Sequence, residues 1–229
     1  RQPHAMSATA SIERQFTPSF DAQVVFTSRR SERLATLRVP VVSGPLMVES
    51  TGTADYKELQ ISVRRTFIDD QQIFVSYVRS TGRGEVNDFT SLFGFVDAPL
   101  VQPGALARLS TEAPHRLLAW GTLNLPRRIV VSPVAEWRSG FPYSVLDHQY
   151  VYSETPNSRE FPKFFAADLV AYKTMTLKKR DIDVGFQLFN VTNHKNPRDV
   201  YAVTNGPHFG QFANSVGTIL RGYMLVKWN

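Results

Sequence analysis

The stretch that decides the fold is DYKELQISVRRTF, which runs from Asp55 to Phe67. Its side chains alternate, with an apolar set of Leu59, Ile61, Val63 and Phe67 and a polar set of Glu58, Gln60, Ser62 and Arg64. Successive side chains of a β-strand point to opposite faces of the sheet, so this period of two predicts a strand with one apolar and one polar face. What lies against the apolar face decides the class of protein.

A second stretch, DIDVGFQLFNVTNHKNPRDV from Asp181 to Val200, repeats this pattern and then leaves it. In its first half, one face takes Ile182, Val184, Phe186 and Leu188, and the other takes Asp183, Gly185 and Gln187. Its second half is polar and contains Asn and Pro, which favour turns and loops. We therefore predict a strand that ends near Val191 and is followed by a loop.

The period of two continues through most of the chain, and no amphipathic helix is expected. About nine strands are predicted. Their ranges are Ala8–Phe16, Phe20–Arg33, Asp55–Phe67, Ile73–Thr81, His115–Leu125, Ile129–Ser139, Phe164–Leu177, Asp181–Val191 and Ser215–Trp228. The fold class that follows is all-β with antiparallel strands.

The connections between these strands alternate between short and long. The short turns read TPS, IDDQ, PRR and KKR, and the long connections are residues 34–54, 82–114, 140–163 and 192–214. Long loops without secondary structure are uncommon in compact soluble domains. Outer-membrane β-barrels, in contrast, have short turns on one rim and long loops on the other. The alternation therefore predicts a transmembrane barrel, with apolar faces against lipid and polar faces toward a wet lumen.

This orientation nominates two groups of residues for contact with a ligand. The lumen-facing candidates are Glu58, Gln60, Arg64, Glu136, Arg138, Asp183, Gln187 and Arg221. The candidates in the long loops are Phe93, Tyr143, Tyr152, His194 and His208. Aromatic residues near the strand ends fit the girdles of a barrel at the short-turn side (Phe16, Phe67 and Trp228) and at the long-loop side (Tyr77, Trp137, Phe141 and Phe189).

Composition excludes several other classes. The 229 residues include no cysteine, which removes disulfides, thiol catalysis and cysteine metal sites. The net charge is +6, but the basic residues are spread along the chain, so nucleic acid is not an expected partner. No HExxH, GxSxG or phosphate-loop pattern occurs. We expect no catalytic residue, metal or cofactor. The start at Arg1, without Met or a signal pattern, is what a piece of a longer chain would show.

Several stretches resemble the barrel end of TonB-dependent outer-membrane receptors, especially the Oar-like group. They are HRLLAWGTLNLP (His115–Pro126), WRSGFPYSVLD (Trp137–Asp147), FFAADLVAYKTMTL (Phe164–Leu177), GFQLFNVTNHKNPRDV (Gly185–Val200) and FGQFANSVGTILRGYMLVKW (Phe209–Trp228). The run from Phe189 to Val200 is the most specific of them, and DYKELQISVRRTF also fits.

The resemblance implies that residues 1–229 are one partial domain, the C-terminal part of a barrel of about twenty-two strands. The N-terminal plug and earlier strands would be absent from it. The implied function is energy-coupled uptake of a bulky ligand across the bacterial outer membrane, without catalysis. The implied partners are outer-membrane lipid, the ligand, a TonB-type protein that acts through the plug, and the barrel assembly machinery. Trp228 would be the assembly signal, although Asn229 follows it where the family ends on an aromatic residue.

Two alternatives remain open at this point. A soluble carbohydrate-binding or adhesive β-sandwich would use loop Tyr and Trp residues for sugar stacking, and a β-rich hydrolase would place carboxylates in a cleft. The sandwich requires a second sheet packed over the Leu59, Ile61 and Val63 stripe, whereas a barrel leaves this stripe uncovered by protein.

Overall fold

The computed structural model describes residues 2–38, 47–68, 71–85, 106–149, 151–217 and 219–228. The described residues form strands, turns and loops, and they include no helix that is long and apolar enough to cross a membrane. The strands of the main sheet are β1 (His4–Thr17), β2 (Phe20–Arg38), β3 (Met47–Thr66), β4 (Gln72–Glu85), β6 (His115–Leu125), β7 (Ile129–Arg138), β10 (Phe164–Leu177), β11 (Arg180–Phe189) and β14 (Arg221–Trp228).

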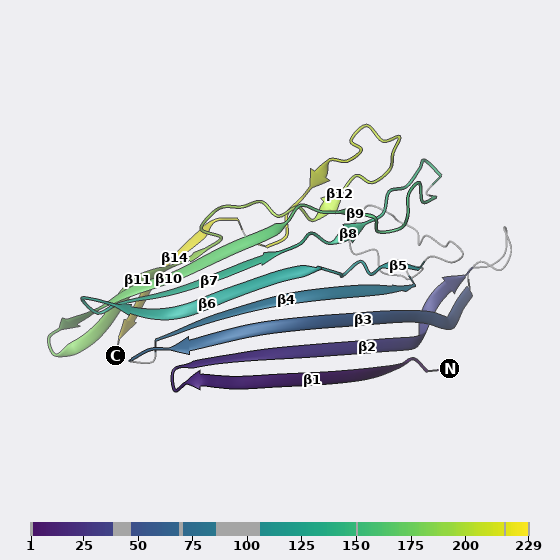
Figure 1. The fold of residues 1–229 in the computed structure, drawn as a ribbon. Helices are drawn as coiled ribbons and strands as arrows, with labels where there is room; N and C mark the ends of the chain where they lie inside the picture. The colour runs from purple at the N-terminus through teal and green to yellow at the C-terminus, as the bar shows by residue number, and fades with distance from the viewer. Residues whose placement is uncertain are drawn as a thin grey trace.

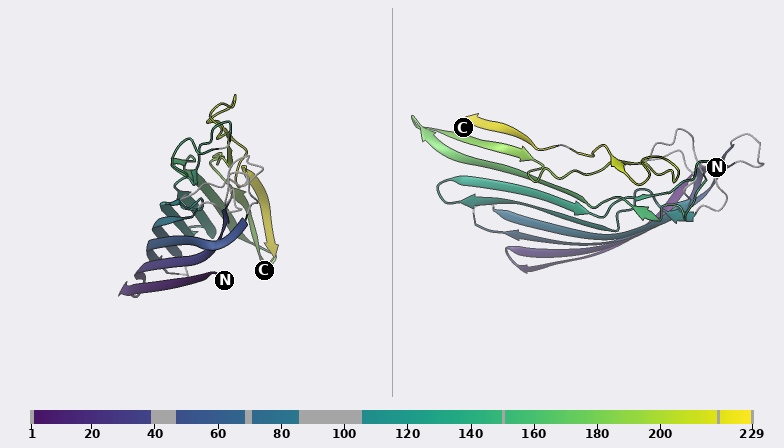
Figure 2. Two further views of the ribbon diagram at one scale, coloured as in Figure 1. Left: turned by 90° about the vertical axis from the view of Figure 1, so that its right-hand side faces the viewer. Right: turned by 90° about the horizontal axis from the view of Figure 1, so that it is seen from above.

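These nine strands pair in chain order, and every pairing is antiparallel. The short β5 (Leu106–Arg108) adds a tenth strand beside the end of β4. Figure 1 shows a single layer of long strands, and Figure 2 (left) shows this layer bent into an arch with β1 in purple and β14 in yellow at its two ends. The predicted fold class is confirmed: the chain is all-β, with nine consecutive antiparallel strands.

Register joins the apolar side chains of neighbouring strands into continuous rows. Paired residues point to the same face of a sheet, so each row can be followed from strand to strand. One row reads Ile12, Val24, Ile61, Tyr77, Leu117, Trp137 and Phe165. The next row, on the opposite face, reads Glu13, Gln23, Ser62, Ser76, Leu118, Glu136 and Ala166. The first face is therefore mainly apolar, whereas the second carries most of the polar side chains together with apolar ones on β4, β6 and β7, among them Phe74, Val78, Leu118, Trp120 and Val134.

Exposure shows which face is convex. Side chains on the concave face of a curved sheet converge and shield one another, whereas those on the convex face diverge. Along β3, Ile61 on the apolar face is 42% exposed, while its neighbour Ser62 on the polar face is 6% exposed. Ser76 on β4 is buried in the same way, although no other sheet or helix of the described residues lies over it. The polar face is therefore the concave face of the arch, and the apolar face is the convex face.

The convex face carries large apolar side chains that nothing described covers. The exposed ones include Met6, Ile12, Val24, Phe26, Leu59, Ile61, Ile73, Leu117, Phe186, Met224, Val226 and Trp228. Ile182 is an exception on this face, since it is buried where it pairs with Met175 and Trp228. The packed second sheet that a β-sandwich requires is absent from the described part of the chain, and the stripe of Leu59 and Ile61 is open.

Several strand ends differ from prediction: β1 begins at His4 rather than Ala8, β4 ends at Glu85 rather than Thr81, and β11 ends at Phe189 rather than Val191. β2 and β3 continue to pair as far as Arg38 and Met47, so most of residues 34–54 is strand rather than a long loop. The pairing passes a bulge at Arg33, whose φ of 57° breaks the alternation that sequence reading relies on. β14 begins at Arg221, later than Ser215. Phe189 lies on the concave face beside Tyr223, so it does not belong to an outer aromatic girdle.

The turns at one end of the sheet are tight and basic. Residues 178–179 join β10 to β11, and residues 126–128 join β6 to β7. Arg127, Arg128, Lys178 and Lys179 all have positive φ angles, from 46° to 69°. This is the left-handed conformation that a two-residue hairpin turn requires and that Asn and Gly adopt at the lowest cost. The two turns are linked because Arg128 Nη2 lies 2.6 Å from Asp181 Oδ2.

The long connections lie at the opposite end and contain the best-buried apolar residues of the described part of the chain. The segment 139–163 includes β8 (Pro142–Tyr143) and β9 (Arg159–Glu160), and the segment 190–217 includes β12 (Asp199–Val200) and β13 (Phe212–Ala213). Tyr143, Val145, Phe161 and Val200 form a buried cluster with Ala202 and Phe209 against it. We call the described residues of these two segments the loop module.

Candidate functional site

The loop module is built as one unit from the β7–β10 and β11–β14 connections. Leu146 donates its backbone N–H to Ala202 O at 3.0 Å, and its carbonyl accepts the N–H of Thr204 at 2.8 Å. Beneath these bonds, Tyr143, Phe161 and Phe212 contact one another with ring centroids 5.2 to 6.2 Å apart. Two loops that share a hydrophobic core and backbone hydrogen bonds present one preformed surface rather than two independent ones.

Two asparagines explain the polar run after β11. The Asn196 amide pairs with both backbone groups of Phe165, accepting its N–H and donating to its carbonyl at 2.9 Å each, so it acts as an extra strand residue beside β10. Asn190 has a φ of 48°, donates its side chain N–H to His194 O and accepts the His194 N–H. Both asparagines are buried. The FNVTNHKNP stretch therefore fixes where the loop leaves the sheet.

An ion cluster ties the loop module to the neighbouring connection. Arg108 on β5 forms 2.6 Å contacts with Glu112 through Nε and with Glu160 through Nη1. Burial works against its charge, but these hydrogen bonds prevail and raise the pKa of Arg108. Glu112, which is itself buried, also accepts the N–H of Gly82 at 3.1 Å. Sequence reasoning missed this cluster, because its members are dispersed and no spacing rule connects them.

The predicted lumen-facing residues all lie on the concave face. Register places Glu58, Gln60, Arg64, Glu136, Arg138, Asp183, Gln187 and Arg221 there. Several of them bond to neighbours on that face: Gln60 donates to Ser76 Oγ at 3.2 Å, and Asp183 accepts from Thr174 Oγ1 at 2.7 Å. Together they form a hydrogen-bonding wall. Their role toward a ligand stays a prediction.

One charge cluster on this wall contains Arg116, Glu136 and Arg138. Glu136 Oε1 lies 3.1 Å from Arg116 Nε and 3.9 Å from Arg138 Nε. The Arg138 guanidinium carbon lies 4.1 Å from the ring centre of Phe141 and 4.3 Å from that of Phe164. Both rings belong to the boundary between the sheet and the loop module, since Phe141 O accepts the Phe161 N–H. Arg116 was not among the predicted residues.

The predicted loop residues are not brought together into one site. Tyr143 is 7% exposed and belongs to the core of the loop module. Tyr152 lies opposite Leu146 in an isolated bridge. His194 contacts Phe165 and His208 contacts Tyr201, each through its ring. Phe93 lies outside the described residues. Among the residues that are described, no three His, Asp or Glu side chains could share a metal ion.

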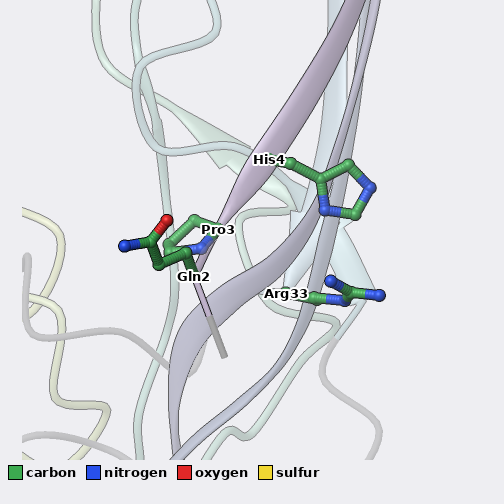
Figure 3. A pocket seen from close by; sticks show the side chains of 4 residues that line it. All are labelled: Gln2, Pro3, His4 and Arg33. Atoms are coloured by element: carbon green, nitrogen blue, oxygen red, sulfur yellow. The ribbon is translucent and has the colours of Figure 1, made fainter.

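A hollow of about 570 Å³ lies at the start of β1 and is lined by Gln2, Pro3, His4 and Arg33 (Figure 3). His4 Nε2 is 3.5 Å from Glu32 Oε2 across the β1–β2 ladder. The hollow is wide open and sits on the outermost strand, without the nucleophile or paired carboxylates that catalysis would need. The concave face and the loop module are therefore the better candidates for a functional site.

Comparison with known proteins identifies structures that have a similar fold. No family profile matches the sequence, and no curated protein is significantly similar to it. Solved structures that share its fold include a chain of the FpvAI–pyocin S2 complex (10% identity, TM-score 0.60), the outer membrane transporter YddB from Escherichia coli (12%, 0.63) and the FrpB iron transporter from Neisseria meningitidis, F3-3 variant (11%, 0.62).

The matches cover 98%, 100% and 98% of this chain, but only 27%, 32% and 31% of those chains. The chain therefore spans about a third of the length of the structures it matches. At such low identity the similarity concerns the fold, which is that of part of an outer-membrane β-barrel.

Proposed function

We propose that this chain is part of the barrel of a bacterial outer-membrane transporter that resembles the TonB-dependent receptors, as in the Oar-like group. The single observation that carries the proposal is the division of one uncovered sheet into an apolar convex face and a polar concave face. A soluble protein buries its apolar face against a second layer. A barrel in a membrane places that face against lipid and closes on a wet interior.

Outer-membrane lipid is then the partner of the convex face. Aromatic and basic side chains border the apolar band, as at a membrane interface. On the short-turn side, Arg14 lies over Phe16 and Arg65 over Phe67, with 5.1 and 4.9 Å from guanidinium carbon to ring centre. On the long-loop side, Lys163 Nζ lies 5.7 Å from the Trp137 ring centre. Residues 1–229 form a single partial barrel domain in this proposal.

The transported ligand is bulky and is first bound by the loops. The loop module supports this step, because its shared core holds two connections in one arrangement before a ligand arrives. Passage along the concave wall is driven through a plug by a TonB-type energy-coupling protein, as the resemblance implies. The concave wall supplies hydrogen bonds and charge, and we propose transport without enzymatic activity, as the resemblance implies.

Assembly uses the last described strand. Trp228 ends β14 at the short-turn end of the sheet and is 69% exposed on the convex face. It pairs with Ile182 of β11, so its ring lies in line with the apolar band. An exposed aromatic at this position suits recognition by the barrel assembly machinery, which is the role we propose for it.

Fractionation of the complete protein tests the proposal. The gene product, with all sequence that accompanies this segment, is expressed in a Gram-negative host, and the membranes are separated on a density gradient. We expect it in the outer-membrane fraction, released by detergent and not by salt or carbonate. Recovery as a soluble, monodisperse protein would overturn the transporter reading. Crosslinking to a TonB-type protein tests the energy coupling separately, and its absence in the presence of bound ligand would overturn that part.

A further inference from the structure

Two arginines face each other directly across neighbouring strands of the concave face. Arg116 of β6 and Arg138 of β7 are register partners. Like charges placed directly opposite each other in an antiparallel pair destabilise the sheet. Among the described residues, one carboxylate, that of Glu136, lies within ion-pair distance of both guanidinium groups, at 3.1 and 3.9 Å. The cluster therefore keeps one uncompensated positive charge on the wall of the proposed lumen.

Arg138 is held in place before any ligand arrives. Its guanidinium carbon lies 4.1 and 4.3 Å from the ring centres of Phe141 and Phe164, and its side chain is 14% exposed. Contacts of this kind with aromatic rings stabilise a cation and restrict its rotation. A guanidinium group that is ordered in this way loses little entropy when it binds an anion.

The pair also has spare hydrogen-bond donors. Each guanidinium group carries five N–H donors. Within the described part of the chain, these two guanidinium groups donate one hydrogen bond, which runs from Arg116 Nε to Glu136. Arg116 is the outer partner, with a side chain that is 51% exposed, so a ligand can reach it.

We propose that Arg116 and Arg138 form a binding site for an oxyanion of the ligand, a carboxylate or a phosphate, where the concave face meets the loop module. The inference rests on the proposed function and adds the chemical class of the ligand. Two guanidinium groups match the two oxygens of such an anion through charge-assisted hydrogen bonds. Glu136 orients Arg116 and limits the net charge of the empty site.

The test measures binding of two probes, pyrophosphate and citrate, to the complete protein in detergent micelles by isothermal titration calorimetry. Arg116→Gln and Arg138→Gln should each weaken binding about tenfold to a hundredfold, the loss expected for a hydrogen bond to a charged group. Glu136→Gln should tighten binding, because it removes the competing carboxylate. Arg65→Gln is the matched control: Arg65 also lies over a phenylalanine ring, but on the convex face, and its loss should leave the affinity unchanged.

The outcomes separate this site from the proposed function. A preference for pyrophosphate or for citrate identifies the ligand group as a phosphate or a carboxylate, and either supports the site. Equal affinity of the wild type and the Arg116→Gln/Arg138→Gln double variant would overturn it, as would the failure of both probes to bind the wild type. Heat-modifiable migration in gels confirms that each variant is a folded barrel. Loss of the site in a protein that still fractionates with the outer membrane leaves the transporter proposal standing.

Discussion

Moving one positive charge between adjacent residues of β3 tests which face of the sheet meets lipid. Ile61 lies on the convex face, in the middle of an apolar row between Val24 and Tyr77. Gln60 lies one residue earlier on the concave face, between Val25 and Val78, where it donates to Ser76. In the proposed barrel, Ile61→Arg places a guanidinium group against hydrocarbon, and Gln60→Arg places the same group in the lumen.

The expected magnitudes differ widely. A charged Arg at the midplane of a lipid-facing barrel strand costs about 2–4 kcal/mol, whereas substitutions in the lumen mainly change selectivity. Ile61 lies between Leu59 and Val63 on the same face of β3, so its side chain is near the centre of the apolar band. We expect Ile61→Arg to lose about 2–4 kcal/mol of folding free energy and Gln60→Arg to lose less than about 1 kcal/mol, chiefly through the bond to Ser76.

The assay is urea titration of the complete protein folding into lipid vesicles, followed by tryptophan fluorescence and by heat-modifiable migration. Ile61→Gln serves as a control that is polar but uncharged and should cost less than Ile61→Arg. If Gln60→Arg were as costly as Ile61→Arg, or if Ile61→Arg were tolerated without loss, the assignment of the convex face to lipid would be refuted.

Three further predictions concern the turns and the loop module. Replacing Lys178 and Lys179 by Asn and Gly should stabilise the protein by about 1–2 kcal/mol in the same titration, because Asn–Gly suits the left-handed turn. Asn196→Ala should cost about 1–3 kcal/mol and speed proteolysis of the loop module, since it leaves both backbone groups of Phe165 without their partner. Hydrogen bonds from Arg198 lower the pKa of Asp199. The ionised Asp199 therefore stabilises the fold fully above pH 3.8, and this stabilisation is lost as the pH falls through the lowered pKa. Thermal melts monitored by near-ultraviolet circular dichroism measure this loss.

Each of these predictions has its own control. Lys178→Ala removes charge but keeps the unfavourable φ, so a gain as large as that from Asn–Gly would show that charge repulsion, and not backbone strain, was relieved. Asn196→Asp keeps an acceptor for the Phe165 N–H and should cost less than Ala; an equal cost would contradict the assigned geometry. Asp199→Asn should flatten the acid limb of the melts, and an unchanged limb would assign the pH dependence to another carboxylate.

The main sheet could be predicted because period-two alternation is a local property of the sequence. The position of each residue from Leu59 to Arg64 along the strand determines which face of the sheet its side chain occupies. The strand His115–Leu125 was predicted with the same ends that the structure shows. The residues predicted for the polar face lie on the concave face for the same reason. Paired residues of neighbouring strands point to the same face, so the alternation continues from one strand to the next. The predicted end of the second strand was wrong because a bulge around Arg33 interrupts the alternation of side chains there.

The loop module could not be predicted, because its contacts join residues that no periodicity relates. Tyr143 meets Phe212 and Leu146 meets Thr204 across more than fifty positions of sequence. Tyr143 looked like an exposed loop aromatic, and it proved to be a core residue. Arg116 was overlooked because its importance comes from the residue opposite it, Arg138, and that pairing exists only once β6 and β7 are aligned.

The two outermost strands have a consequence for how such a molecule enters a membrane. Among the described strands, β1 pairs with β2 and β14 pairs with β11, so each has one flank of amide and carbonyl groups without a strand beside it. Each unpaired group costs several kcal/mol in hydrocarbon. In the proposed barrel, both margins must therefore pair with the strands that complete it before they leave water, which couples strand pairing to membrane insertion.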